Sequence, residues 1–401
     1  MRIALVGPAH PYKGGGARHT TELAHRLTAA GHDVIIESWR AQYPARLYPG
    51  QQTLDTPEGD PYPRTYRRLA WYRPDGWLSA GRRLRSADLV VFALLTPIQA
   101  PAYLAILAAL RTTLRTALRT TLRTTLRHRA RTAVICHNVL PHERRPGDVP
   151  LTRALLSAAD LAVVHSAAQA AQARTLAPRT QIAVAQMPAH LPAVATAPAD
   201  VREIHCPERA VVPPPGQPQS SVADPEPGAT TCRLLFFGIV RPYKGLDVLL
   251  QALAQVPAHV TLTVAGEFWG GTDDTEKLIA DLGLTDRVTL RPGYVPASDI
   301  PALFGAADAL VLPYREATAS QNALLAFAHG IPVITTTAGT LADHVRHNVD
   351  GLTCAPGDPD ALARALTAVS DPQTARRLRA AVTPIDPDPA WSAYLDALLE
   401  G

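Results

Sequence analysis

Short apolar runs alternate along the chain with amphipathic stretches and with turns that contain glycine or proline. The first run, residues 3–7 (IALVG), precedes a glycine-rich loop and residues 17–31, whose Leu23 and Leu27 share one face of a helix that is expected to end at Gly31. Further strands are expected at residues 33–38, 89–95, 132–138, 160–166, 232–238, 260–266, 287–293, 308–314 and 331–336. Such alternation predicts an α/β fold with parallel sheets and crossover helices.

Residues 188–230 interrupt this alternation. They are rich in Pro, Ala and Ser, so we expect a stiff, partly extended linker or a mobile loop. The pattern then restarts with CRLLFFG and an expected helix at residues 246–256. The sequence therefore predicts two Rossmann-like domains, residues 1–187 and 231–385. Ligands of such sheets bind at the carboxyl ends of the strands, so the cleft between the domains is the expected site.

The composition is that of a globular protein, with 47% hydrophobic and 18% charged residues among 401. The opening MRIALVG lacks the segments of a signal peptide, and the four cysteines show no metal-binding spacing, so free thiols in a reducing cytoplasm are expected. The uncharged residues 89–110 are long enough to cross a bilayer. Pro97, Gln99 and Pro101 interrupt them, which favours a buried strand, a turn and the start of a helix.

Charge is divided unevenly along the chain. Residues 1–190 contain 25 Lys and Arg against 11 Asp and Glu, and residues 191–401 contain 14 against 24. The first half is therefore suited to an anionic partner, such as an anionic lipid, a nucleic acid or a phosphorylated substrate. The alternative is that the two halves attract each other.

Residues 236–252 (FFGIVRPYKGLDVLLQA) place two cations, Arg241 and Lys244, between a strand and a helix. Cations beside a helix N-terminus suit a diphosphate, whereas a solvated basic turn is the simpler interpretation. The stretch resembles the donor loop of GT-B glycosyltransferases of family four. The resemblance implies that Lys244 and Arg241 hold the donor diphosphate and assist catalysis. The commoner arginine position of the family contains Ile239 here, and Arg241 follows two residues later.

The resemblance extends over nearly the whole chain except the linker and the repeat described below. The opening loop, residues 14–34 (GGGARHTTELAHRLTAAGHDV), is similar to the family's first loop and helix, which implies that Gly15 and Gly16 approach the diphosphate. Residues 136–143 (CHNVLPHE) resemble the segment that contains a histidine near the acceptor, here His137. Residues 265–269 and 291–314 resemble the donor-base segments. The donor-binding residues implied in these segments and in the cation loop are Gly238, Gly266, Glu267 and Tyr294.

Residues 314–336 (YREATASQNALLAFAHGIPVITT) depart from the family pattern. The family often has two glutamates separated by seven residues, and these positions hold Ala317 and Leu325 here. Glu316 lies one residue early and is expected to reach the donor sugar. We expect three neighbours to offer N–H groups to a phosphate at a helix N-terminus: Ser320, Gln321 and Asn322. Because Leu325 cannot bind ribose hydroxyls, a non-catalytic partner subunit of a glycosylation complex stays an alternative.

Neither a metal nor another cofactor is expected. The pairs Asp358/Asp360 and Asp386/Asp388 imitate a DxD motif, but a central proline suits turns and helix starts, and both lie outside the expected cleft. The resemblance also implies that a terminal helix, residues 386–401, crosses back to the first domain, with Trp391 as a packing residue.

Residues 110–127 (LRTTLRTALRTTLRTTLR) repeat about every four positions. In a helix each step exceeds one turn by about 40°, so the arginine stripe rotates around the axis and a core helix is disfavoured. Aromatic residues do not interleave the arginines, which disfavours nucleic acid. Either the repeat is a tolerated extension, or residues 110–131 lie on an anionic membrane. The resemblance predicts a retaining hexosyltransferase, cytoplasmic or membrane-peripheral. It would move sugar from a nucleoside-diphosphate sugar to a glycan, lipid-linked or small-molecule acceptor.

Overall fold

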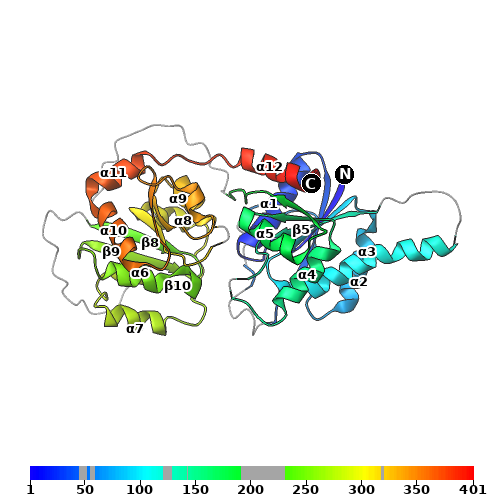
Figure 1. Ribbon diagram of the computed structural model, residues 1–401, viewed down its shortest axis with the longest axis horizontal. Coiled ribbons are helices and arrows are strands. Elements are labelled where there is room, and N and C mark those ends of the chain that lie inside the picture. The colour runs from blue at the N-terminus through cyan, green and yellow to red at the C-terminus, as the bar shows by residue number, and fades with distance from the viewer. Residues whose placement is uncertain (45–51, 55–58, 121–128, 142, 191–230, 318–319) are drawn as a thin grey trace.

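The computed structural model describes residues 1–44, 52–54, 59–120, 129–141, 143–190, 231–317 and 320–401. Two α/β domains lie side by side along the long axis, and the C-terminal helix reaches from the second domain back to the first (Figure 1). Residues 191–230 of the linker predicted at residues 188–230, and the second part of the arginine repeat, residues 121–128, lie outside the described residues.

The first domain is built on a seven-stranded parallel sheet in the order β3-β2-β1-β4-β5-β6-β7. Its strands are β1 (Arg2–Val6), β2 (Asp33–Ala41), β3 (Thr65–Ala70), β4 (Leu89–Leu94), β5 (Arg131–Cys136), β6 (Leu161–Val164) and β7 (Gln181–Val184). Its helices are α1 (Gly15–Ala29), α2 (Pro74–Arg83), α3 (Ala100–Thr120), α4 (Asp148–Ala158) and α5 (Ala167–Leu176). Strand β4 is buried along its whole length, as its uninterrupted apolar sequence predicts for a central strand of a parallel sheet.

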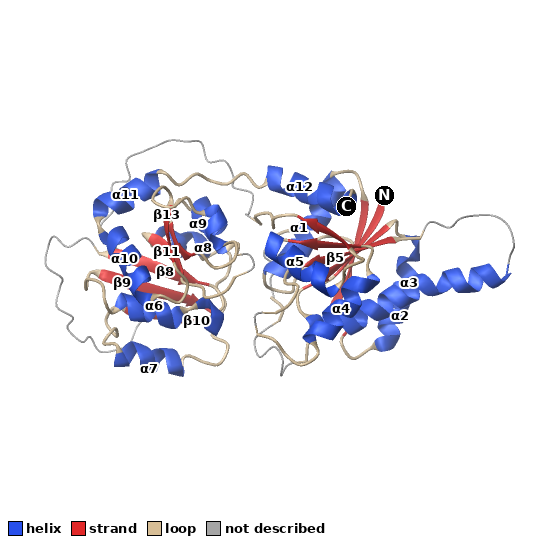
Figure 2. Cartoon of the chain, viewed as in Figure 1, coloured by secondary structure: helices blue, strands red, loops and turns tan. Residues whose placement is uncertain are grey.

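The second domain has a six-stranded parallel sheet in the order β10-β9-β8-β11-β12-β13, with helices on both faces (Figure 2). Its strands are β8 (Cys232–Phe237), β9 (Val260–Gly266), β10 (Val288–Pro292), β11 (Ala309–Leu312), β12 (Val333–Thr336) and β13 (Gly351–Cys354). Its helices are α6 (Leu246–Leu253), α7 (Asp273–Asp281), α8 (Ile300–Gly305), α9 (Asn322–Ala328), α10 (Pro359–Ser370) and α11 (Pro372–Ala380). The prediction of two Rossmann-like units is confirmed.

Helix α12 (Asp388–Leu399) leaves the second domain and packs on the first, beside α1 (Figure 1). Trp391, Tyr394 and Leu398 of this helix join the apolar core of the first-domain sheet. Arg131, at the start of β5, donates hydrogen bonds to the terminal carbonyls of Leu398 and Leu399. The predicted crossing helix and the packing role of Trp391 are both confirmed.

Helix α3 begins at the carboxyl edge of the sheet and runs back along it, so the arginine repeat extends away from that edge. Within the described residues no helix is long and apolar enough to cross a membrane. Residues 89–110 form β4, a turn and the first half of α3, as predicted. Arg111 donates a hydrogen bond to the carbonyl of Ala158 on α4. This side chain therefore lies against the first domain.

Candidate active site

A pocket of about 550 Å³ opens between the two domains, at the carboxyl edges of both sheets. The first domain contributes the glycine-rich loop before α1, residues after β2, the turn after β4 and the segment after β5. The second domain contributes residues after β8 and β9, which are Ile239, Arg241, Tyr243, Lys244 and Trp269. The expected cleft is therefore present, and both predicted phosphate-binding cations line it.

Arg241 lies in the loop after β8 and makes an ion pair with Glu143 of the first domain. Both carboxylate oxygens of Glu143 are engaged, with Nε of Arg241 3.2 Å from Oε1 and the terminal nitrogen on Oε2. The guanidinium also lies 4.6 Å from the ring centre of Trp269. This planar fork is the geometry in which arginine binds carboxylates and phosphates. A protein carboxylate thus binds the arginine that we expected to bind phosphate.

Lys244 closes a 3-10 turn, Pro242–Lys244, directly before α6. Its ammonium lies 5.1 Å from the ring centre of Tyr314. Burial opposes the charge, but the facing Tyr314 and Tyr243 outweigh it and raise the pKa of Lys244, so the side chain stays a cation. The next residue, Gly245, has φ +67°, and a Cβ there would meet the carbonyl oxygen of Pro313 at 2.1 Å. Glycine is thus required for the turn that places Lys244.

The glycine-rich loop faces these cations from the first domain. Gly14, Gly15 and Gly16 all line the pocket. A Cβ on Gly15 would meet nothing within 4 Å, whereas one on Gly16 would press on the side chain of Leu95. An approaching ligand can therefore reach the backbone at Gly15, at the start of α1.

A second cross-domain ion pair joins Lys13 of this loop to Glu267, which follows β9. The Lys13 ammonium also lies 5.4 Å from the ring centre of Tyr294. Gly266, with φ +148°, is pressed against the backbone of Gly238, where a Cβ would come within 2.0 Å of the carbonyl oxygen. Glu267 and Tyr294, expected at the donor base, thus meet at the cleft through Lys13.

Gly238 brings Lys244 close to α9. A Cβ on Gly238 would lie 3.3 Å from the Lys244 ammonium and 3.4 Å from the side-chain nitrogen of Asn322. Asn322 donates to the carbonyl of Phe237 at 2.9 Å, and its own backbone N–H points to the Ser320 hydroxyl at 3.3 Å. That N–H group therefore already has a partner within the chain.

Gln321 accepts a hydrogen bond from the backbone N–H of His190, 3.2 Å away in the first domain. Glu316 is exposed and lies outside the pocket wall. Leu325 packs against the apolar core beneath α9. The side chains of Gln321 and Asn322 are thus hydrogen-bonded to backbone groups of the protein.

His137 does not line the pocket, although the next residue, Asn138, does. It belongs to a cluster of four histidines: His19, His137, His165 and His190. Nδ1 of His19 lies 2.8 Å from Nε2 of His190, and its Nε2 lies 3.1 Å from the Tyr394 hydroxyl. The buried Nε2 atoms of His137 and His165 have no hydrogen-bond partner among the described residues. Burial is the main cause that lowers the pKa of all four, to about 4 for His165 and about 3 for His190. The cluster is therefore neutral at pH 7.

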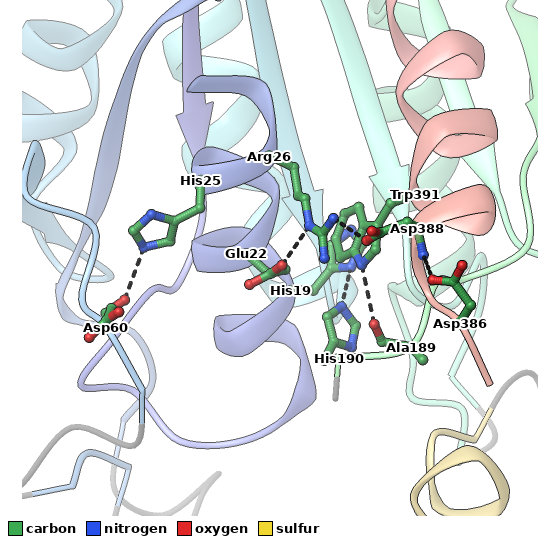
Figure 3. A network of polar contacts seen from close by, with 10 residues as sticks. All are labelled: His19, Glu22, His25, Arg26, Asp60, Ala189, His190, Asp386, Asp388 and Trp391. Atoms are coloured by element: carbon green, nitrogen blue, oxygen red, sulfur yellow. Dashed lines mark hydrogen bonds and ion pairs between the residues drawn. The ribbon is translucent and has the colours of Figure 1, made fainter. Parts of the chain in front are cut away.

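Helix α12 packs Trp391 against His19 and His190 of this cluster (Figure 3). The Trp391 ring stacks on His19 with centres 5.4 Å apart, and its N–H donates to the Ala189 carbonyl at 3.2 Å. Arg26 of α1 lies over Trp391 and pairs with Asp388 at 2.5 Å. The terminal helix thus fixes the histidines behind the pocket.

Metal-binding geometry is not found within the described residues: no group of three or more His, Cys, Asp or Glu side chains could hold an ion. The two DxD-like pairs have structural roles instead. Asp358 caps α10, accepting from the N–H of Ala361 at 2.9 Å, and Asp386 accepts from the N–H of Asp388.

Several residues at the site were not predicted from the sequence. Glu143 and Lys13 were missed because a cross-domain ion pair depends on how the domains dock. His19, His165 and His190 were missed because they come from separate elements. One indication existed for His165: like His137, it directly follows an apolar run, so both lie at the carboxyl edge of the same sheet. His142 lies outside the described residues.

Solved structures share this two-domain architecture over the whole chain. Sucrose-phosphate synthase from Thermosynechococcus elongatus matches with a TM-score of 0.65 and 19% identity, covering 100% of this chain and 96% of its own. Anabaena HepE in complex with UDP-glucose matches with a TM-score of 0.65 and 16% identity, covering 100% of both chains. The protein therefore has the GT-B fold, two Rossmann-like domains facing each other across a cleft.

Sequence comparison gives a match within the second domain. Residues 231–371 match the family model described as Glycosyl transferases group 1. D-inositol 3-phosphate glycosyltransferase 1 of Catenulispora acidiphila is 32% identical over 179 residues, which are 41% of this chain and 42% of the relative. The D-inositol 3-phosphate glycosyltransferase of Salinispora arenicola is 37% identical over 143 residues, 33% of this chain and 32% of the relative. The chain thus spans about two fifths or less of the curated relatives it matches.

Proposed function

We propose that this protein is a glycosyltransferase that moves a hexosyl-type unit from a nucleoside-diphosphate sugar to an acceptor hydroxyl, retaining the anomeric configuration. The supporting observation is the pairing of Lys244 and Arg241, on a glycosyltransferase group 1 domain, with the accessible backbone of Gly15 across one pocket. Together they form a cationic, N–H-lined place for a diphosphate. HepE has been solved with UDP-glucose, which supports a nucleotide sugar as donor.

The two cations would act on the leaving group. As the bond from the anomeric carbon to the phosphate oxygen breaks, negative charge grows on the diphosphate. Lys244 and Arg241, with Gly15, would stabilise that charge, which is commonly a large catalytic contribution. The acceptor oxygen forms the new glycosidic bond, and its proton leaves with the diphosphate. Neutral His137 would take part as a hydrogen-bonding group, because burial disfavours its cationic form.

Calorimetric titration with UDP, GDP and ADP tests the proposal first, followed by transfer assays with the matching sugars. Lys244→Ala should weaken binding of the cognate nucleoside diphosphate by about 1.5–3 kcal/mol, or roughly tenfold to over a hundredfold. Lys277→Ala, which removes an exposed lysine of α7, is the matched control and should bind as the parent does. Equal affinity of the parent and Lys244→Ala would remove the phosphate assignment. Binding without transfer would favour the non-catalytic partner.

Metal independence is part of the proposal. The diphosphate would be neutralised by Lys244 and Arg241, and the acidic pairs near α10 and α12 are engaged in structural hydrogen bonds. Sugar transfer should therefore continue in EDTA. Complete loss, restored by magnesium or manganese, would contradict this assignment.

We also propose a cytoplasmic protein that binds anionic membranes peripherally, with the arginine repeat as one contact. Three arginines of the repeat serve as the test: Arg115, Arg119 and Arg123. The structure does not describe the side chains of Arg115 and Arg119, and it does not describe Arg123 at all. Each arginine near an anionic surface contributes about 1 kcal/mol. Replacing Arg115, Arg119 and Arg123 by Gln should weaken sedimentation with anionic vesicles and flatten its salt dependence. If vesicle binding is unchanged, the repeat is a tolerated extension.

A further inference from the structure

The turn between β3 and α2 exposes large aromatic side chains. Trp71 is 44% exposed and Tyr72 is 51% exposed, and their rings meet edge to face with centres 5.4 Å apart. Tyr66 on β3 and Leu78 on α2 are also exposed. Single exposed apolar residues are ordinary, but several gathered in one stretch mark an interaction surface. We call Tyr66, Trp71, Tyr72 and Leu78 the β3–α2 patch.

This patch lies next to the mouth of the candidate active site. The backbone N–H of Trp71 donates to the carbonyl of Ala41 at 3.0 Å, and the following residues, Gln42 and Tyr43, line the pocket. The Trp71 end of the patch therefore lies beside one wall of the pocket.

Helices α2 and α3 both begin at the carboxyl edge of the sheet and run back side by side (Figure 2). The two helices pack closely where Gly81 of α2 faces Ile106 of α3, because a Cβ on Gly81 would meet the Ile106 carbonyl at 2.5 Å. Seven positions before Gly81 and Ile106 lie Pro74, the first residue of α2, and Gln99, which directly precedes α3, so the start of α2 neighbours the start of α3. Exposed Ile98, which precedes α3 and lines the pocket, thus extends the apolar surface toward the cleft.

The surroundings of the patch are strongly basic. Residues 61–87 contain seven arginines and one acidic residue, Asp75, which is paired with Arg73. Two acids of β2 pair with three of the other arginines, Asp33 with Arg64 and Glu37 with Arg68 and Arg83, so positive charge remains in excess. Arg67 and Arg68 are exposed on β3, and the Arg68 guanidinium lies 4.2 Å from the ring centre of Tyr66. Tryptophan and tyrosine favour the headgroup level of a bilayer, and arginines are attracted to anionic lipid. This charge favours an anionic bilayer over a neutral glycan as the partner.

We propose that the β3–α2 patch inserts into the interface of an anionic membrane and holds the pocket mouth at the lipid surface. The consequence for an acceptor rests on the proposed function: a lipid-linked acceptor would enter the cleft directly from the bilayer. The binding itself needs no substrate, so it can be tested independently. This surface is also distinct from the arginine repeat, which leaves from the opposite end of α3.

The test is sedimentation with two kinds of vesicle. One contains phosphatidylcholine alone, and the other contains phosphatidylcholine with about 30% phosphatidylglycerol, an anionic lipid. The parent should bind the anionic vesicles, and the double variant Trp71→Ser/Tyr72→Ser should bind at least tenfold more weakly. Val349→Ser removes an exposed apolar residue of the second domain and should bind as the parent does. Brominated acyl chains should quench tryptophan fluorescence of the parent more than that of Trp71→Phe.

Several outcomes would overturn the proposal. Equal vesicle binding by the parent and the double variant would do so, as would equal quenching in the parent and Trp71→Phe. Parent binding to a soluble neutral glycan that the double variant loses, with no vesicle binding, would assign the patch to glycans instead. Circular dichroism and nucleotide titration of the double variant establish that it is folded. Failure of the parent to bind any nucleotide would contradict the proposed function without affecting the vesicle result.

Discussion

Arg241, which we expect to bind phosphate, already has a partner within the protein. Its guanidinium pairs with Glu143 across the pocket, in the fork geometry that a phosphate would need. A diphosphate bound to Arg241 must therefore displace that carboxylate. An ion pair that is partly exposed contributes about 0.2–1 kcal/mol, so the competition is moderate.

Glu143→Gln should therefore tighten binding of the cognate nucleoside diphosphate by about 1.4- to fivefold, because the competing anion is gone. Isothermal calorimetry at constant ionic strength measures the change. Asp33→Asn breaks an exposed ion pair with Arg64 at the start of β2, the edge of the sheet opposite the pocket, and should leave affinity unchanged. Weaker binding in Glu143→Gln would mean that Glu143 positions Arg241 rather than competing for it.

Gly245 offers a second residue-scale prediction, about the turn that places Lys244. Gly245→Ala should lower the free energy of unfolding by more than the 1–2 kcal/mol of a left-handed non-glycine residue, because its Cβ would also meet the Pro313 carbonyl. Gly283 has nearly the same φ, +65°, but open space around it, so Gly283→Ala isolates the backbone cost. Urea unfolding of both variants gives the comparison. Equal losses would show that the loop relaxes around the new methyl group.

At the scale of elements, the buried strands of both sheets could be predicted, because parallel strands covered on two faces are continuous apolar runs. Three strands were not predicted: β3, β7 and β13. Strand β3 contains Arg67 and Arg68, and β7 has no fully buried residue, because both are edge strands. Strand β13 is a short edge strand that begins with glycine. Lys244 could be predicted because the strand, turn and helix that place it are contiguous. The histidine cluster could not, because four elements bring it together.

The histidine cluster, formed by α1 and the segments after β5, β6 and β7, makes the stability of the first domain depend on pH. Each histidine binds a proton less readily when folded than the roughly 6.5 of an unfolded chain, so the unfolded state gains more protons as the pH falls. The contribution of these neutral histidines to the free energy of unfolding is therefore fully present above about pH 6.5. It is lost as the pH falls from there toward the pKa of about 4 for His165.

His165→Gln should reduce this decline by up to about 1.4 kcal/mol per pH unit between pH 6 and pH 5, the effect of one proton. The glutamine can still donate to the Ala185 carbonyl, which lies 3.1 Å from Nδ1 of His165. Urea unfolding at pH 7, 6 and 5 measures the slope. His347→Gln, an exposed site on the second domain, should keep the parent slope. An unchanged slope in His165→Gln would show that this histidine is charged in the folded protein.

At the scale of the whole molecule, the docking of the domains reflects the uneven charge of the sequence. Lys13 of the basic first half pairs with Glu267 of the acidic second half, so attraction between the halves operates at the cleft itself. The pair Arg241–Glu143 has the opposite polarity, and His190 adds a neutral hydrogen bond to Gln321. The charge asymmetry alone thus did not determine which residues meet.

Lys13–Glu267 is the more buried of the two ion pairs, with the Lys13 side chain only 4% exposed. Removing one partner of a buried pair leaves the other charge uncompensated and commonly costs about 3–5 kcal/mol. The domains can avoid most of that cost by separating, because separation returns Lys13 to water. Glu267→Gln should therefore open the cleft, which small-angle X-ray scattering would register as a larger radius of gyration.

Since the Lys13–Glu267 pair is shielded from solvent, the parent should stay closed when salt is raised. Glu276→Gln, an exposed acid of α7, controls for the lost charge and should scatter as the parent does. An unchanged radius in Glu267→Gln would mean that Arg241–Glu143 and the His190–Gln321 hydrogen bond suffice to hold the domains together.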